Sequence, residues 1–265
     1  MKLRIQHTTK YHYDAPVSYG LQQIRLIPAN SKHQTVQSWA VDIKGGSTEL
    51  EFEDQYQNKT LLVKADPETT ELSVDVVGEV ETHCSDGVFG KVYGTAPLWH
   101  FRQSTPRTQA GRGVRKLAKT LQKAPDILDG LHALSNAIID AAPYSMTDTE
   151  AHTTAEEALS AGGGVCQDHA QIFVSAARVA GIPARYISGY LMMNDRVDQD
   201  ASHAWAEAHL DGLGWVGFDV SNRICPDERY VRIATGLDSH DASPMSGIRL
   251  GSARESMIVS LQVQQ

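Results

Sequence analysis

Three residues in the second half of the chain are of the types that thiol acyl transfer requires: a cysteine, a histidine and an aspartate. Cys166 follows the glycines of AGGGVC and opens an apolar stretch predicted to be a buried helix up to Ala180. Unpaired N–H groups at a helix start favour a thiolate and can hold a developing oxyanion. The glycines before it, Gly164 among them, would let a substrate carbonyl approach. Taken alone, such a cysteine favours a structural role, as a buried residue that begins a core helix.

His203 and Asp219 lie on two predicted strands, SHAWAEAHL and WVGFDVS, joined by the turn-like DGLG. Their side chains share a sheet face, as opposite or diagonal neighbours, only if the loop has an odd number of residues. We therefore expect a three- or five-residue loop, or a bulge, around residues 211–214. In that geometry Cys166 is a nucleophile, His203 its base, and Asp219 the carboxylate that orients the histidine.

The histidine strand has two distinct faces. Its alanines share one face, which suits packing against the buried helix, while His203, Trp205, Glu207 and His209 share the other. Trp205 is expected to shield the histidine–aspartate bond or to line the acyl site, with Glu207 and His209 as an exposed continuation. Arg185 is expected to have a structural role. His169 is a second candidate base, but a base on the cysteine's own helix reaches a substrate poorly, so we expect it in the core.

The remaining segments divide into three ranges. Residues 1–85 contain several short alternating strands, which predict a β-sandwich-like domain that acts as scaffold or lid rather than as a binding module. Residues 86–110 are rich in Gly and Pro and predict a connecting segment. Residues 111–265 begin with amphipathic helices, continue with strands and end in a β-rich tail, which predicts an α+β catalytic domain.

Composition limits the possible partners. The 265 residues carry 32 acidic and 24 basic side chains, a formal net charge of −8, which disfavours nucleic acid and anionic membranes as partners. No signal peptide or membrane span is visible, and three separated cysteines suggest neither disulfides nor zinc, so we expect a cytoplasmic protein. We expect no cofactor and no metal. The oligomeric state cannot be read from the sequence.

The stretch GGGVCQDHAQIFVSAARVAGIPARYISGYL, followed by SHAWAEAHLDGLGWVGFDVSN, resembles the catalytic core of the transglutaminase-like superfamily, on a branch of bacterial proteins regarded as cysteine proteases. The N-terminal LRIQHTTKYHYDAPV resembles the β-rich domain that accompanies that core. The resemblance implies a papain-like α+β fold with a helix bearing the nucleophile against an antiparallel sheet. It also implies that Cys166, His203 and Asp219 form the triad. One departure is VSN after the aspartate, where the family more often has Pro-Thr-Asn.

The resemblance also suggests further cleft residues. Tyr144 resembles an aromatic residue upstream of the family's cysteine, where it would be a second oxyanion donor or a cleft wall. We place Gly164, Gln167 and Trp205 in the same oxyanion or substrate cleft. The expected activity is that of a cysteine peptidase or amidase on a peptide, an isopeptide or a small amide. The alternatives are an amine-acceptor transglutaminase and a non-catalytic interaction module.

Overall fold

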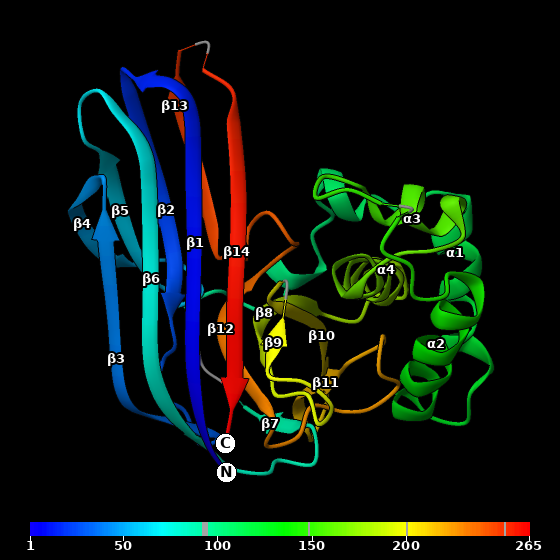
Figure 1. The fold of residues 1–265 in the computed structure, drawn as a ribbon. Helices are drawn as coiled ribbons and strands as arrows, with labels where there is room; N and C mark the ends of the chain where they lie inside the picture. The colour runs from blue at the N-terminus through cyan, green and yellow to red at the C-terminus, as the bar shows by residue number, and fades with distance from the viewer. Residues whose placement is uncertain (92–94, 148, 200, 252) are drawn as a thin grey trace.

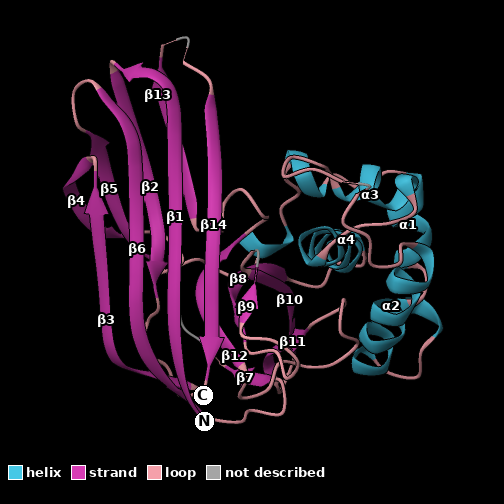
Figure 2. Ribbon diagram, in the orientation of Figure 1, coloured by secondary structure: helices cyan, strands magenta, loops and turns pink. Residues whose placement is uncertain are grey.

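The computed structural model places a β-sandwich beside a core of helices packed on a sheet (Figure 1). It describes residues 1–91, 95–147, 149–199, 201–251 and 253–265. Strands make up the sandwich, and the helices gather on the far side of the core sheet from it (Figure 2). The fold is α+β with antiparallel strand pairing in each described sheet, as expected.

The sandwich consists of two antiparallel sheets. In spatial order, the described strands of the first are β3 (Gln34–Lys44), β6 (Thr69–Thr82), β1 (Lys2–Val17), β14 (Glu255–Gln264) and β9 (Asp198–Gln199). Those of the second are β13 (Met245–Leu250), β2 (Tyr19–Ile27), β5 (Lys59–Ala65) and β4 (Gly46–Glu53). Along β1, buried side chains alternate with more exposed ones, because successive residues of a strand point to opposite faces.

The last two strands complete the sandwich. β14 pairs with β1 along its length, from Arg4 opposite Gln264 to Tyr13 opposite Glu255, and β13 pairs with β2. Leu261 on β14 joins the apolar cluster that also contains Leu3 and Ile5. The sequence analysis placed these two strands in the catalytic domain of residues 111–265, but they belong to the sandwich. They pair there because β1 and β2 would otherwise each expose an edge of unpaired backbone N–H and C=O groups.

The core sheet consists of β12 (Tyr230–Gly236), β8 (Ala184–Leu191), β10 (His203–Leu210), β11 (Gly214–Phe218) and β7 (Val88–Gly90). Strand β7 comes from the connecting segment, which also forms the short 3₁₀ helices η1 (His100–Arg102) and η2 (Pro106–Thr108). The connecting segment therefore extends the core sheet and packs along it.

The helices cover one face of that sheet. They are α1 (Arg112–Ala118), α2 (Ile127–Ala141), α3 (Ala155–Ala161) and α4 (Cys166–Val179), with the 3₁₀ helix η3 (Leu121–Lys123) between α1 and α2. The Asp126 carboxylate accepts the Asp129 N–H at 2.9 Å to begin α2, and a capping box between Thr154 and Glu157 begins α3. These local signals explain where both helices start.

Helix α4 lies at the centre of the core, between the sheet and the other helices. Its apolar residues pack against Ala204, Ala206 and Ala208 of β10 within one buried cluster, as the alanine face predicted. The buried Arg178 near its C-terminus donates hydrogen bonds to the Phe101 carbonyl and the Thr108 hydroxyl of the connecting segment and to the Ala184 carbonyl of β8. The C-terminal end of the helix is therefore held in place.

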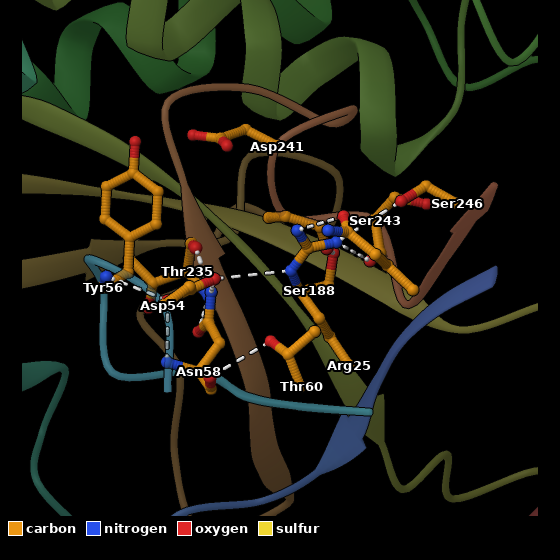
Figure 3. Close-up of polar contacts among 12 residues, drawn as sticks. Arg25, Asp54, Tyr56, Asn58, Thr60, Ser188, Thr235, Asp241, Ser243 and Ser246 are labelled. Atoms are coloured by element: carbon orange, nitrogen blue, oxygen red, sulfur yellow. Dashed lines mark hydrogen bonds and ion pairs between the residues drawn. The ribbon is translucent and has the colours of Figure 1, made fainter. Parts of the chain in front are cut away.

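Two amide side chains of the sandwich bind the backbone of β12, and we call them the amide clamps. Gln34 donates to the Arg232 carbonyl and accepts from the Arg232 N–H, both at 2.9 Å. Asn58 forms the same reciprocal pair with Thr235, both bonds at 2.8 Å. The Asp54 carboxylate holds Asn58 in position from the same loop (Figure 3). The clamps satisfy backbone groups of an edge strand and join sandwich to core.

Candidate active site

Cys166 is the first residue of α4, and its side chain is half-buried. The N–H groups of the first helical turn have no partner within the helix. The buried Asp168 supports this helix start, because its carboxylate accepts the Val165 N–H at 2.9 Å and the Thr149 hydroxyl at 2.5 Å. Asp168 thus stabilises the turn.

The glycines before Cys166 have structural causes that the sequence interpretation missed. Gly162 ends α3 with a φ of +77°, a left-handed conformation that favours glycine. A Cβ on Gly164 would lie 2.8 Å from the Cβ of Asp168. Gly164 is therefore required by the Asp168 side chain, and clearance for a substrate is not needed to explain it.

The hairpin of β10 and β11 brings His203 and Asp219 together. Leu210 pairs with Gly214, which leaves a three-residue turn at residues 211–213 and confirms the odd loop length. Nε2 of His203 lies 2.6 Å from Oδ2 of Asp219. Since Nε2 is used by the carboxylate, Nδ1 is the ring nitrogen left for Cys166, which lies near enough to raise the pKa of the imidazole.

Asp219 is completely buried and receives further hydrogen bonds from two residues that the sequence analysis did not identify. The Tyr230 hydroxyl donates to its Oδ2 at 2.7 Å, and the Asn222 amide donates to the same oxygen at 2.8 Å. Asn222 is the residue of VSN that matches the family pattern, so it could have been found. Tyr230 lies on β12, and no local pattern connects it to Asp219.

His203 and Asp219 each stabilise the charged form of the other. Burial opposes the charged form of His203, but Cys166 and Asp219 outweigh it and raise the pKa of the imidazole to about 10. Burial would likewise raise the pKa of Asp219, but His203 and the hydrogen bonds from Asn222 and Tyr230 lower it below its ordinary value. The geometry thus favours an imidazolium held between a carboxylate and a thiol.

Aromatic rings enclose the histidine–aspartate pair. The Trp205 ring stacks beside His203 with 6.5 Å between centroids, and the Tyr230 ring lies 5.9 Å from His203. Trp205 is almost completely buried, which favours shielding of the pair over lining an open acyl site. A pair removed from water in this way interacts more strongly than one at the surface.

Comparisons with known proteins match two regions of the chain to family models. Residues 115–220 match the model of the transglutaminase-like superfamily, and residues 3–81 match the bacterial transglutaminase-like N-terminal region. The core of this chain is transglutaminase-like. Its helix α4 and the strands β8, β10 and β11 lie within the first of these matches.

The chain is similar to bacterial proteins, to some over nearly its whole length and to others over about half of it. The chain is 26% identical to the uncharacterized protein ML0607 of Mycobacterium leprae, over 99% of this chain and 98% of that one. It is 34% identical to the uncharacterized protein Rv2569c of Mycobacterium tuberculosis, over 54% of this chain and 49% of that one. A crystal structure from Cytophaga hutchinsonii, described as a "Putative Cysteine Protease", shares the fold with a TM-score of 0.79 at 23% identity, covering 100% of this chain and 91% of that one.

In the transglutaminase-like core, His169 has a structural role. It is completely buried, and burial lowers its pKa, with a smaller opposing effect from its hydrogen bond to Ala142. Nε2 lies 2.8 Å from the Ala142 carbonyl, which can only accept, so Nδ1 accepts from the Ser221 hydroxyl at 2.7 Å. Ser221, in the VSN departure, thereby ties the turn after Asp219 to helix α4.

Tyr144 and Gln167 differ in their relation to the thiol. Tyr144 is 57% exposed and forms a bridge with Gly164, and burial together with the nearby Cys166 raises the pKa of its hydroxyl. It therefore stays a neutral donor near the sulfur. The Gln167 amide donates to the Ala151 carbonyl at 3.1 Å, so its side chain supports the neighbouring loop.

Glu207 was expected to be exposed, and this was wrong. It is 0% exposed and lies opposite Arg185 across β8 and β10. Nε of Arg185 donates to Oε2 at 2.7 Å, and Arg232 contacts the other carboxylate oxygen. Alternation predicted the shared face correctly, but it cannot show that the sandwich and connecting segment cover that face.

Cys84 and Cys225 are free thiols, and no group of three His, Cys, Asp or Glu side chains within the described ranges is arranged to hold a metal ion. No helix in the described part of the chain is long and apolar enough to cross a membrane.

Proposed function

We propose that the chain is a thiol-dependent amide acyl-transfer enzyme that forms an acyl-enzyme on Cys166. The observation that carries the proposal is the buried His203–Asp219 pair, joined at 2.6 Å, beside a cysteine at the start of α4. Membership of the core in the transglutaminase-like superfamily supports it.

In the first half-reaction, the Cys166 thiolate attacks the amide carbonyl and the C=O π electrons move to the oxygen. N–H groups of the first turn of α4 stabilise this oxyanion, with the Tyr144 hydroxyl as a further donor. The oxyanion then collapses, the C–N bond breaks, and His203 gives its proton to the leaving amine. The products are a free amine and a thioester on Cys166.

In the second half-reaction, neutral His203 takes a proton from water as the water oxygen attacks the thioester. The C–S bond breaks, the carboxylic acid leaves, and the thiolate–imidazolium pair is restored. The substrate we propose is a peptide, an isopeptide or a small amide, and hydrolysis is the preferred outcome. An amine in place of water gives transamidation by the same steps.

The test is alkylation by iodoacetamide near neutral pH, with the chain's other thiols as internal controls. Cys84 is exposed and Cys225 is half-buried, so accessibility alone predicts that Cys84 reacts fastest. We expect Cys166 to react about tenfold faster or more, because a neighbouring imidazolium favours the thiolate. Equal or slower reaction of Cys166 contradicts the proposal.

Turnover provides the second measurement. A screen of peptide and isopeptide substrates, with and without an amine acceptor, separates hydrolysis from transamidation. Cys166→Ala is expected to abolish turnover, whereas Cys225→Ala leaves it unchanged. Turnover that survives Cys166→Ala excludes the mechanism, and the absence of both turnover and enhanced thiol reactivity favours a non-catalytic interaction module.

A further inference from the structure

A cavity of about 410 Å³ lies at the end of β10 farthest from His203, and we call it the junction cavity. The core sheet, the connecting segment and the β4–β5 loop of the sandwich all contribute to its walls. Its volume is within the range of about 300–1,000 Å³ that is usual for small-molecule sites. His209 in its wall is six residues from His203, about 20 Å along an extended strand. The junction cavity is therefore separate from the proposed active site.

The charge of the junction cavity is opposite to that of the chain. Its described lining includes Lys91 and Arg185 and contains no Asp or Glu, although the whole chain has 32 acidic and 24 basic side chains. Burial lowers the pKa of His209, which also lines the cavity, so the positive charge comes from the lysine and the arginine. A positive concave surface in an acidic protein selects anions over cations.

Arg185 supplies a fixed, buried positive charge to this cavity. Its Nε and Nη2 both lie 2.7 Å from Oε2 of Glu207, and its guanidinium lies 3.9 Å above the Trp215 ring. Glu207 also pairs with Arg232, so one carboxylate faces two guanidinium groups and a net positive charge remains. Burial lowers the pKa of Arg185 only to about 10, which leaves it protonated near neutral pH.

Flat aromatic surfaces form the walls beside this charge. Phe101 and Trp215 pack edge to face with 5.0 Å between ring centroids, and Tyr56 lies 5.9 Å from Phe101. The loop that carries Tyr56 is fixed by the Asn58 clamp on Thr235 (Figure 3). The walls are therefore preformed, which reduces the entropic cost of binding.

We propose that the junction cavity binds a small aromatic carboxylate. Nε and Nη2 of Arg185 hold Glu207, which leaves Nη1 and the second hydrogen of Nη2 to donate to a ligand carboxylate, and Lys91 adds a second positive charge. The aromatic body of the ligand then lies against Trp215, Phe101 and Tyr56. This site is independent of the thiol chemistry proposed above.

The test is isothermal titration of the full chain with N-acetylphenylalanine and, as a matched probe, its uncharged carboxamide. We expect the acid to bind with a Kd of about 1 mM or below and at least tenfold more tightly than the amide. Equal affinities, or no saturable binding of the acid, would overturn the proposal. Binding by Cys166→Ala must equal that of the parent protein, because binding that requires Cys166 places the ligand in the other site.

Surface variants locate the bound acid without disturbing the buried arginine. Leu98 is 41% exposed and lines the junction cavity, so Leu98→Asp should weaken binding at least fivefold relative to the neutral Leu98→Asn. Lys91→Gln should weaken it several-fold. Ile248→Asp, which places the same charge on the exposed β13 outside the described lining, should leave it unchanged. If Leu98→Asp and Leu98→Asn bind the acid equally, the cavity is not the binding site.

Discussion

Two carboxylates of the core, Asp219 and Glu207, are both completely buried, yet they have different partners. Asp219 is held by His203, Tyr230 and Asn222, of which only the histidine can carry a positive charge. Glu207 is held by the permanently charged Arg185 and Arg232. The negative charge of Asp219 therefore stabilises the protonated form of His203. The negative charge of Glu207 is instead neutralised by the two arginines.

This difference separates the proposed active site from a structural ion pair on the same sheet. A buried ion pair with two arginines contributes specificity of packing, and breaking it is costly because a charge is left unpaired. Neutral donors around a carboxylate fix its orientation while keeping it basic enough to hold an imidazolium. The same change from acid to amide should therefore have different consequences at the two positions.

Asp219→Asn is the change expected to have the largest effect on function. The amide cannot hold His203 in its charged form, so amide turnover should fall by about 10³-fold or more. The pKa of His203 should also fall, which NMR titration of its ring would measure without any substrate. Turnover within about tenfold of the parent would show that Asp219 does not orient the base.

Glu207→Gln is the matched change at the other carboxylate. It leaves Arg185 and Arg232 without a counter-charge, so the free energy of unfolding should fall by about 3 kcal/mol, measured by urea denaturation. Alkylation of Cys166 should stay near the parental rate. If the thiol loses reactivity while stability is unchanged, the two carboxylates do not have the separate roles described above.

Tyr230→Phe removes one neutral donor from Asp219 while keeping the ring beside His203. A hydrogen bond to a buried charge is lost, and turnover should fall about tenfold. Tyr190→Phe is the control, because it removes a buried hydroxyl that contacts His7 at 2.8 Å in another part of the molecule. Both variants should lose about 1 kcal/mol of stability. Equal activity of the two would assign Tyr230 a purely structural role.

The smallest predicted effect is on the pH dependence of stability. Because the folded-state pKa of His203 is raised from 6.5 to about 10, its protonation stabilises the fold fully below pH 6.5. That contribution is lost as the pH rises through about 10. Cys166→Ala removes one of the two side chains that raise the pKa of His203. The free energy of unfolding of this variant should therefore decline less steeply between pH 6.5 and about 10 than that of the parent protein. Identical pH profiles would contradict the thiolate–imidazolium pairing.

Much of the candidate site could be predicted because its signals are local in the chain. The helix start at Cys166 and the odd hairpin loop between His203 and Asp219 follow from the 3.6-residue and two-residue periods of helices and strands. The participation of Tyr230 and the burial of Glu207 depend on neighbours brought in by β12 and the sandwich. Periodicity assigns a residue to a face, but it does not reveal what covers that face.

The sandwich shows the same limit on a larger scale. Alternation predicted strands in residues 1–85 and in the tail, but pairing partners between distant segments have no signature in either segment alone. The structural reason for a glycine at position 164 could not be predicted from the sequence either, because it also depends on a contact that forms only on folding. Its constraint comes from the Asp168 side chain, which turns back onto the loop once α4 has formed.

The pairing of β14 with β1 has a consequence for how the protein is made. A ribosome produces β1 long before β14, so one edge of β1 stays open while the whole core is synthesised. Closing so long a loop is entropically costly and slow, and it comes at the end of folding. A nascent chain therefore carries Cys166 before the sandwich beside the core is complete. Chains interrupted before residue 255 would keep an open strand edge that quality-control proteases can recognise.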